Sequence, residues 1–325
     1  MSLDIGGVIS QMEVVSLPIV LGYVLHRLGV LGGEFDHKLT TLVLNIALPC
    51  TVLSSLSTVD ALPGRGETLR VVLLMAVAMV VSWLVAVAAS RVMRVPRGVE
   101  GAYRFAMMFG NAGFIGFPVI SSVLGDGALL LAVIASVPGN IFMFTVGAGM
   151  FRARDLAQPD IEAGHGTGRA RKLASALASF KTPTIIASMT ALVLILAGVR
   201  DLGVAGSAMS VVGQMSTPAA LLIVGSSLAQ YNPLEMVGNP RAYFAAAFRL
   251  LGIPLACLTV LGLAGVDRMV RSVIVLECAM PVATNGTLYC MQSGMDATPM
   301  MQITFLSVVG SILTIPVVSV LLGAC

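Results

Sequence analysis

The sequence has 325 residues, of which 57% are hydrophobic and only 11% are charged, and its formal net charge is +3. Its mean hydropathy is +0.95. Such a composition is typical of a polytopic membrane protein and excludes an ordinary soluble domain. The small positive charge comes from an uneven distribution of Lys and Arg between loops, so it gives no reason to expect a nucleic-acid partner.

Windows of about 20 apolar residues, the length that spans the hydrocarbon core of a bilayer, recur along the whole chain. They predict an all-α membrane protein with ten transmembrane helices. In chain order, we place these helices at residues 7–28, 38–58, 69–91, 100–124, 127–150, 182–199, 205–230, 241–263, 270–294 and 298–323.

The loops on alternate sides of the predicted helices differ in basic charge. One side carries thirteen of the 19 Lys and Arg residues and the other carries five, while Arg249 lies within the predicted eighth helix. Basic loops usually stay on the cytoplasmic side of a membrane. We therefore expect a multi-pass protein of a bacterial inner membrane, with both termini outside the cytoplasm.

One long polar segment divides the chain almost in half. Residues 151–180 separate a first half, 1–150, from a second half, 181–325, and each half has five predicted helices. Because five is an odd number, the second half must enter the membrane from the opposite side. The sequence therefore predicts two inverted repeats, an arrangement typical of secondary transporters. Residues that recur at a nearly constant spacing support this, and the pairs are Asn45 and Gln214, Pro49 and Pro218, Gly116 and Gly286, Gly125 and Gly294, and Asp126 and Asp296.

Two apolar stretches at corresponding places in the halves are interrupted by Gly, Pro and Asn, namely "FGNAGFIGFP" at 109–118 and "AMPVATNG" at 279–286. A break in a helix frees N–H and C=O groups inside the membrane, where half-helix ends can bind an anion or a cation. We therefore expect a substrate site at the two breaks. The alternative is that the small residues serve only close helix packing. The candidate site residues are Asn111, Gly113, Gly116, Pro118, Pro281, Thr284 and Asn285.

Two further polar residues, Asn45 and Gln214, each precede a proline by one turn, in the second and seventh predicted helices. A proline within a helix leaves a carbonyl group without its usual partner. The side chains of Asn45 and Gln214 either face the substrate cavity or bond to the carbonyl groups that Pro49 and Pro218 release. Both interpretations remain open at this point.

Glu277 is the most informative acidic residue, because it lies well inside the predicted ninth helix, one turn before Pro281. An ionisable side chain at such a depth is by default a functional candidate. It could carry a coupling proton or coordinate a cation such as sodium. The structural alternative is a buried ion pair with Arg249, whose long side chain could instead extend to the cytoplasmic surface.

The sequence lacks the patterns of other chemistries. Its five Cys and three His residues do not have the spacing of metal ligands, so we expect no metal site and no cofactor. The predicted helices also lack the Ser/His, paired Asp or His-Glu-x-x-His arrangements of an intramembrane hydrolase, so we expect no enzyme. An ion channel or a non-transporting sensor would fit the same pattern and remains an alternative to a transporter.

Four motifs are "NIALPC" in the second predicted helix, "MFGNAGFIGFPVI" in the fourth, "STPAALLIVGSSLA" in the seventh and "AMPVATNGTLY" in the ninth. Together they resemble the auxin efflux carrier family, which includes bacterial malonate and malate permeases and, more distantly, plant PIN proteins. The resemblance covers nearly the whole chain. The central segment is short, and in this respect the chain resembles the bacterial branch of the family rather than the plant carriers with a long central loop.

The resemblance implies two inverted five-helix repeats, as in bile-acid symporters and NhaA. Helices 1, 2, 6 and 7 would form a scaffold, and helices 3–5 and 8–10 would form a moving core in which broken helices 4 and 9 cross. The resemblance also implies alternating-access transport, of the elevator type, of a small organic anion such as malonate, malate or an auxin-like acid, and a homodimer formed through the scaffold. It places Asn45 and Gln214 on the scaffold, and at the crossing it places Asn111, Gly113, Gly116, Pro118, Pro281 and Asn285.

Overall fold

The computed structural model describes residues 17–57, 63–125, 127–151, 183–199, 202–283 and 285–324. Within these ranges the ordered elements are helices, and the extended backbone amounts to one isolated bridge. The prediction of an all-α, polytopic membrane protein is therefore confirmed. Among the described residues, six helical stretches are long and apolar enough to cross a membrane, and they are Gly33–Ser57, Arg65–Val92, Gly127–Phe151, Gly203–Ala229, Pro240–Leu263 and Thr298–Gly323.

Two shorter apolar helices, Leu17–Arg27 and Pro183–Ala197, correspond to the predicted first and sixth helices. The fourth and ninth predicted helices, 100–124 and 270–294, are each divided in two by non-helical residues. The number of membrane crossings and the inverted repeat stay predictions.

The first half contains α2 to α8. Their bounds, with those of the short turns between them, are α2 (Gly33–Leu42), η1 (Val43–Ala47), α3 (Leu48–Ser54), η2 (Ser55–Ser57), α4 (Arg65–Val92), α5 (Glu100–Met108), η3 (Ala112–Gly116), α6 (Phe117–Leu124), α7 (Gly127–Phe142), η4 (Met143–Gly147) and α8 (Ala148–Phe151).

The second half contains α10 to α18. Their bounds are α10 (Pro183–Ala197), α11 (Gly203–Gly213), α12 (Ser216–Ala229), α13 (Pro233–Met236), α14 (Pro240–Ala247), η6 (Phe248–Gly252), α15 (Ile253–Leu263), α16 (Arg268–Ala279), α17 (Asn285–Gln292) and α18 (Thr298–Ala324).

In the described ranges, widened π-helical turns occur in four places, η1, η3, η4 and η6. Three of them stand directly before a helix that has proline in its first turn, at Pro49, Pro118 and Pro254. Proline has no N–H to donate, and its ring clashes with the carbonyl group four residues earlier, so the preceding turn widens to avoid it. The prolines therefore explain why these helices change their pitch without ending.

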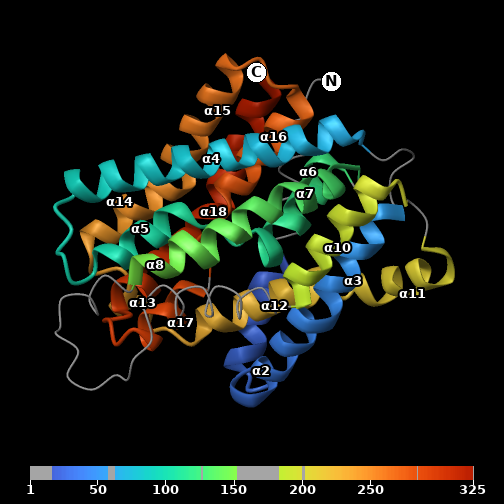
Figure 1. The fold of residues 1–325 in the computed structure, drawn as a ribbon. Helices are drawn as coiled ribbons and strands as arrows, with labels where there is room; N and C mark the ends of the chain where they lie inside the picture. Colours follow the sequence, from blue (N-terminus) through green and yellow to red (C-terminus); the bar gives the residue numbers. More distant parts are fainter. Residues whose placement is uncertain are drawn as a thin grey trace, which may run out of the picture.

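The helices pack in two groups (Figure 1). In one, α3 packs against α10 and α11, and α12 packs against α2. In the other, the long α4 lies across α5 and α7 and contacts α15 and α16, while α14 and α18 pack against each other and against α5. The groups meet where α7 contacts α10 and where η3 contacts α12. We call them the α3 group and the α4 group.

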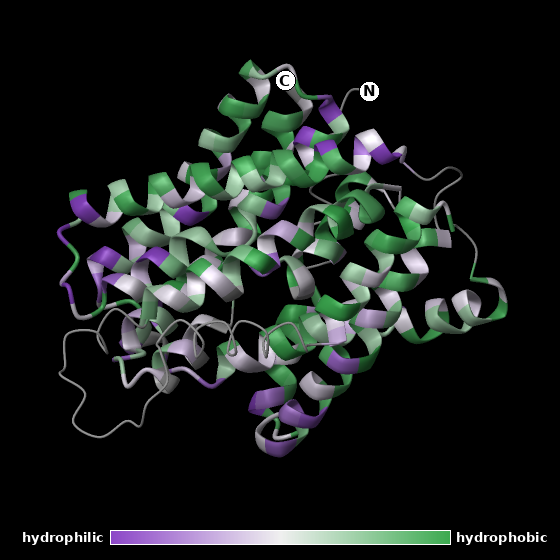
Figure 2. Cartoon of the chain, viewed as in Figure 1, coloured by the Kyte–Doolittle hydropathy of each residue, from purple (hydrophilic) through white to green (hydrophobic). Residues whose placement is uncertain are grey.

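Apolar side chains cover much of the outer surface, as the green outer faces of α4 and α15 in Figure 2 show. Leu73 is 66% exposed and Leu263 is 87% exposed. Such apolar faces are stable in contact with the hydrocarbon chains of lipids, whereas their exposure to water would be unfavourable. Polar residues gather instead at helix ends and in the connections (Figure 2).

Candidate functional site

Two helices of the α4 group are broken at the two stretches that the sequence analysis identified. α5 ends at Met108, and the chain becomes helical again at Ala112. α16 ends at Ala279, and α17 begins at Asn285. Each break leaves backbone N–H and C=O groups without their helical partners, and inside a membrane these groups need other partners.

The two breaks bond to each other through their backbones. The N–H of Asn111 donates to the carbonyl oxygen of Pro281 over 2.8 Å, and the N–H of Ala283 donates to the carbonyl oxygen of Phe109 over 3.0 Å. The residues between these partners form an antiparallel bridge. Four backbone groups that the breaks release are thereby satisfied without water.

Small residues allow this close approach. A Cβ atom at Gly116 would lie 3.3 Å from Cγ of Met280, so η3 runs close beside the other break. Behind the bridge, Ser307 of α18 accepts a hydrogen bond from the N–H of Val282 at 3.0 Å. Both Pro118 and Pro281 are buried. Close packing, the alternative role considered for the small residues at the breaks, therefore occurs at the same place as the candidate site.

Arg249, in η6, lies between the ends of α5 and α16. Its Nε donates to the carbonyl oxygen of Met280 at 2.7 Å, and its Nη1 donates to that of Met108 at 2.8 Å. Longer bonds join Nη1 to the carbonyl oxygen of Met107 at 3.2 Å and Nη2 to that of Glu277 at 3.3 Å. The residue is 1% exposed, so the alternative that its side chain extends to the cytoplasmic surface is wrong.

The positive charge of Arg249 is stabilised by the C-terminal ends of two helices. A helix C-terminus carries a partial negative charge of about half a unit, and its last carbonyl groups lack helical partners. The guanidinium group of Arg249 bonds to such carbonyl groups from two helices at once. One positive charge therefore balances two helix ends, and the buried cation keeps hydrogen-bond partners.

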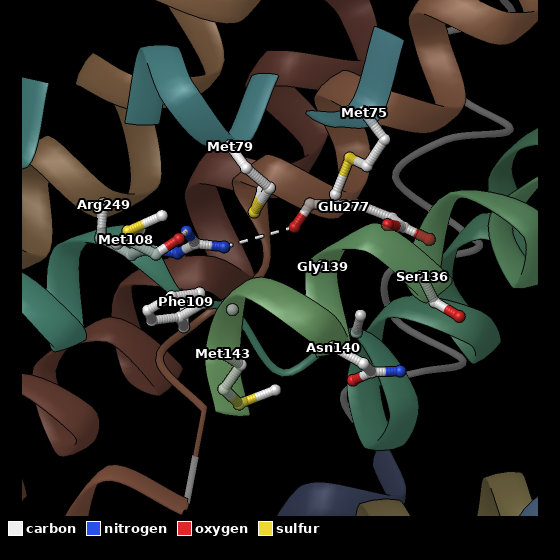
Figure 3. A pocket seen from close by; sticks show the side chains of 12 residues that line it. Met75, Met79, Met108, Phe109, Ser136, Gly139, Asn140, Met143, Arg249 and Glu277 are labelled. Carbon is white, nitrogen blue, oxygen red and sulfur yellow. Dashed lines mark hydrogen bonds between the residues drawn. The ribbon is translucent and has the colours of Figure 1, made fainter. Parts of the chain in front are cut away.

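Glu277 points away from Arg249. Figure 3 shows the carboxyl group of Glu277 directed toward Met75 and Ser136. The guanidinium group of Arg249 bonds to the backbone carbonyl oxygen of Glu277 and not to its carboxyl group. Glu277 is 3% exposed, and neither carboxyl oxygen has a hydrogen-bond partner among the described residues. The ion pair between Glu277 and Arg249, which the sequence left open as an alternative, is therefore wrong for this conformation.

A small cavity lies beside the carboxyl group (Figure 3). Its volume is about 30 Å³, room for about two water molecules. We call it the core cavity, because it lies within the α4 group. It is lined by Met75, Met79, Met108, Phe109, Gly110, Ala112, Ser136, Gly139, Asn140, Met143, Arg249 and Glu277.

A second cavity lies on the other side of η3, between the two helix groups. Its volume is about 60 Å³, and hydroxyl groups from both helix groups line it. We call it the interface cavity. Its lining residues are Leu48, Thr51, Gly113, Phe117, Pro118, Ser121, Leu129, Ser216 and Thr217.

Hydroxyl groups hold the α3 side of the interface cavity together. The hydroxyl of Thr51 lies 2.8 Å from that of Ser216, and it also lies 2.9 Å from the carbonyl oxygen of Gly213, to which it donates. A Cβ atom at Gly213 would lie 2.9 Å from the backbone nitrogen of Thr51, so α3 and α11 pack in close contact.

The predicted site residues are distributed unevenly around these cavities. Gly113 and Pro118 line the interface cavity, and Asn111 is buried at 7% exposure between the breaks. Asn45 and Gln214 are exposed, and neither lines the core cavity or the interface cavity. Thr284 lies outside the described residues, and Asn285 is described only as the first residue of α17.

Sequence reasoning missed the polar residues that line the cavities from other helices, namely Thr51, Ser121, Ser136, Asn140, Ser216 and Thr217. Asn140 offered a signal, because it is an amide side chain within a predicted apolar helix. The Ser and Thr residues offered none, since hydroxyl side chains bond to their own helix in many membrane proteins. Among the described residues, no group of three or more His, Cys, Asp or Glu side chains could hold a metal ion.

Known proteins are similar to this chain over almost its full length. A family model described as a membrane transport protein matches residues 8–319. An uncharacterized transporter of Methanothermobacter thermautotrophicus is 26% identical over 304 residues, which are 94% of this chain and 95% of that protein. An uncharacterized transporter of Methanocaldococcus jannaschii is 23% identical over 282 residues, which are 85% of this chain and 87% of that protein. The family match includes both breaks.

Proposed function

Because the chain belongs to the membrane transport protein family, the family of the auxin efflux carriers, we propose that it is a secondary active transporter of a small organic anion. The observation that carries this proposal is the pair of helix breaks that bond to each other between Asn111 and Pro281. Paired breaks place helix ends inside the membrane, where a continuous helix would present only its side chains.

An anion is the substrate class that the helix beginnings favour. A helix N-terminus carries a partial positive charge and unpaired N–H groups, which bind carboxylates well. The chain becomes helical again at Ala112 and at Asn285, beside the paired breaks. We expect a carboxylate to bind near Asn111, with Thr284 and Asn285 as further candidate contacts, and to use the hydroxyl groups of the interface cavity.

The position of the interface cavity supports alternating access. It lies between the α3 group and the α4 group, so a movement of one group past the other would change the side of the membrane from which the cavity is reached. In this proposal the α3 group is the scaffold and the α4 group is the moving core of an elevator-type transporter. Asn45 and Gln214, now exposed, would approach the substrate only in another conformation.

A glycine with positive φ after each of two corresponding helices supports the proposed inverted repeat of ten helices. Gly125 follows α6 with φ 88°, and its sequence partner Gly294 follows α17 with φ 60°. Both lie in the left-handed region, which glycine adopts at little cost. We further propose that both termini lie outside the cytoplasm of a bacterial cell, that the protein resides in the inner membrane, and that two copies associate through the scaffold.

The experiment that tests this proposal measures flux in proteoliposomes. Purified protein is first screened for binding of mono- and dicarboxylates, including malonate, malate and indole acids, and the tightest ligand is then followed as a labelled solute. Accumulation against its gradient, or exchange with unlabelled ligand, is the expected result. Passive conductance without exchange would support a channel, and binding without any flux would support a sensor, so either outcome would overturn the proposal.

A further inference from the structure

We propose that Arg249 is a built-in cation that occupies the carbonyl cluster at the paired helix breaks in place of a metal ion, and that Glu277 carries a proton as the coupling ion. This inference rests on the proposed transport function and names its coupling ion. The sequence left the choice between a proton and sodium open. The surroundings of two side chains, Arg249 and Glu277, favour the proton.

The carbonyl cluster has the chemistry of a cation site. Four backbone oxygens, those of Met107, Met108, Glu277 and Met280, converge on one guanidinium group. Carbonyl groups at the ends of broken helices are the ligands that coupling cations use in membrane transporters. Here every one of these oxygens already accepts a hydrogen bond from Arg249, whose charge would repel a second cation.

On the side that faces the bridge, the cluster has no spare room for an ion. The guanidinium group lies so close to the bridge that even a Cβ atom at Gly110 would come within 1.9 Å of Nη2. Arg249 belongs to a continuous stretch, Pro240–Leu263, so its side chain stays tethered beside the carbonyl groups. A sodium ion would therefore need to displace a tethered group of the same charge.

Glu277 has no such partner. Within the part of the chain that the structure describes, both of its carboxyl oxygens are buried without a hydrogen bond, and the core cavity lies directly beside them (Figure 3). An ionised carboxylate in these surroundings would be unpaired and largely desolvated, a state that proteins avoid by neutralising the group. A proton bound to one carboxyl oxygen makes the group neutral.

Few other charged or titratable groups face Glu277. The elements packed against α16 are α4, α6, α7, α15, α18, η3 and η6. Of these, α6, α7, α18 and η3 contain no charged or titratable residue, and α4 has its charges only in its end turns, at Arg65, Glu67, Arg70 and Arg91. The remaining groups on the described elements are Arg249 of η6, the thiol of Cys257 in α15, and three residues of α16 itself. These are Arg268 and Arg271 in its first turn and Cys278, whose Sγ lies 3.9 Å from that of Cys257.

The core cavity gives the proton a place to enter. It has room for about two water molecules, and the polar residues Ser136 and Asn140 line it on α7. Water there could bond to the carboxyl group and deliver or accept its proton. The proton site in the core cavity is thus separate from the interface cavity, and η3 and its neighbours lie between the two.

The first test concerns sodium and uses purified protein without substrate. We compare the melting temperature in sodium chloride, potassium chloride and choline chloride at equal ionic strength, and we measure binding of radioactive sodium directly. The wild-type protein is expected to melt at the same temperature in all three salts and to bind no sodium. Stabilisation specific to sodium, or saturable binding of sodium, would overturn the inference.

Arg249→Ala provides the complementary result. Removal of the side chain leaves four carbonyl oxygens facing an empty site, so this variant is expected to melt at a lower temperature and to recover part of the loss with millimolar methylguanidinium or with sodium. Arg241→Ala is the matched control, because it removes an exposed arginine from the same continuous stretch. If Arg249→Ala does not fold, Arg249→Lys, which keeps the charge but only one donor group, is measured instead. A variant that gains nothing from either cation would overturn the built-in-cation assignment.

The second test detects the proton by infrared spectroscopy at neutral pH. A protonated carboxyl group has a C=O stretch that an ionised one lacks, and the wild-type protein is expected to show such a band that Glu277→Gln loses. Glu67→Gln, at an exposed residue of α4, is expected to leave the band unchanged. A spectrum without this band in the wild-type protein would contradict the proton assignment.

Flux measurements separate the inference from the proposed function. With the labelled anion identified in the binding screen, Glu277→Gln is expected to lose uptake driven by a pH gradient and to keep exchange. A protein that moves no anion would overturn the proposed function while the sodium and infrared results still decide the ion assignment. Uptake that depends on a sodium gradient would overturn the inference and leave the transport function intact.

Discussion

Gly110 and Arg249 are in direct contact, and a Cβ atom at residue 110 would lie 1.9 Å from Nη2 and 2.9 Å from Cζ of the arginine. The same Cβ atom would lie 3.1 Å from the carbonyl oxygen of Met280, which accepts a hydrogen bond from Nε. No side chain can therefore be added at Gly110 while Arg249 keeps its bonds. The glycine is needed here for space rather than for backbone freedom.

This contact predicts that Gly110→Ala destabilises the protein. The added methyl group must displace the guanidinium group from one or more carbonyl oxygens, and a hydrogen bond to a charged group contributes about 1.5–3 kcal/mol. We expect a loss of this size in the free energy of unfolding. Thermal unfolding in detergent micelles measures it as a lower melting temperature.

Gly113→Ala is the matched control for this prediction. A Cβ atom at Gly113 would meet only Cδ1 of Leu48, at 3.8 Å, which is an ordinary contact. The variant should therefore keep the wild-type melting temperature, although its methyl group would narrow the interface cavity. Equal melting temperatures for Gly110→Ala and Gly113→Ala would show that Arg249 adapts at no cost and that its position is not fixed by Gly110.

Asn111→Ala tests the proposed anion site. If the amide of Asn111 donates a hydrogen bond to a charged substrate, its loss should cost about 1.5–3 kcal/mol of binding free energy, or about a tenfold to hundredfold loss of affinity. Calorimetry with the carboxylate identified in the binding screen measures this change. Because the backbone N–H of Asn111 keeps its bond to Pro281, the break itself should persist.

An unchanged affinity in a folded Asn111→Ala protein would contradict this role. The side chain would then serve only the local structure of the break, and the binding site would have to be sought toward Asn45 and Gln214. Asn111→Asp is a weaker test, because it changes the charge as well as the donor.

The breaks could be predicted from the sequence because Gly, Pro and Asn disturb a helix wherever they occur together. The long helices could be predicted for a similar reason, since a run of apolar residues alone identifies them. The predicted helix at 69–91, for example, is seen as Arg65–Val92. The breaks and the long helices could thus be predicted from the local sequence alone.

The surroundings of Arg249 could not be predicted in this way. Its partners are backbone carbonyl groups, which every residue has, so no side chain in the sequence marks them. The opposite charge of Glu277 suggested an ion pair instead, and packing of η6 against the ends of α5 and α16 overrides that suggestion. The hydroxyl pair of Thr51 and Ser216 was missed because only packing of distant segments brings such common residues together.

Thr51→Val tests the contact between α3 and the helices α11 and α12. The variant keeps the shape of the side chain but removes the hydroxyl group, so the carbonyl oxygen of Gly213 and the hydroxyl of Ser216 lose a partner. A buried polar group without a partner costs about 1–3 kcal/mol of folding free energy. We therefore expect Thr51→Val to have a lower melting temperature than the wild-type protein. Thr51→Ser should retain most of the stability.

The exposed Thr41 offers a control for this measurement, because its hydroxyl bonds only to the carbonyl oxygen of His37 in its own helix. Thr41→Val is expected to change the melting temperature little. If Thr51→Val proves as stable as Thr41→Val, the hydroxyl pair does not hold the α3 group together and its position at the interface cavity has another cause.

The last prediction concerns Asp296, which precedes α18 outside the membrane-spanning segments. Its carboxylate accepts a hydrogen bond of 2.9 Å from the N–H of Thr298, and this bond, followed by one from the Thr298 hydroxyl, lowers the pKa of Asp296 below its usual value. A carboxylate at a helix N-terminus satisfies free N–H groups and interacts favourably with the helix dipole. Asp296→Ala should therefore lower the free energy of unfolding by about 1 kcal/mol at neutral pH.

The lowered pKa fixes the sign of the pH dependence. Because the folded protein holds Asp296 ionised more strongly than the unfolded chain does, the stabilisation is complete above the unfolded pKa of about 3.9 and is lost as the pH falls through the lower folded value. The melting temperatures of wild type and Asp296→Ala, measured over a pH series, should thus converge at acidic pH. Asp296→Asn, which still accepts a hydrogen bond but has no charge to lose, should differ from the wild-type protein less than Asp296→Ala does at neutral pH. A difference between wild type and Asp296→Ala that persists unchanged into strong acid would show that the carboxylate contributes nothing through its charge and acts as a spacer alone.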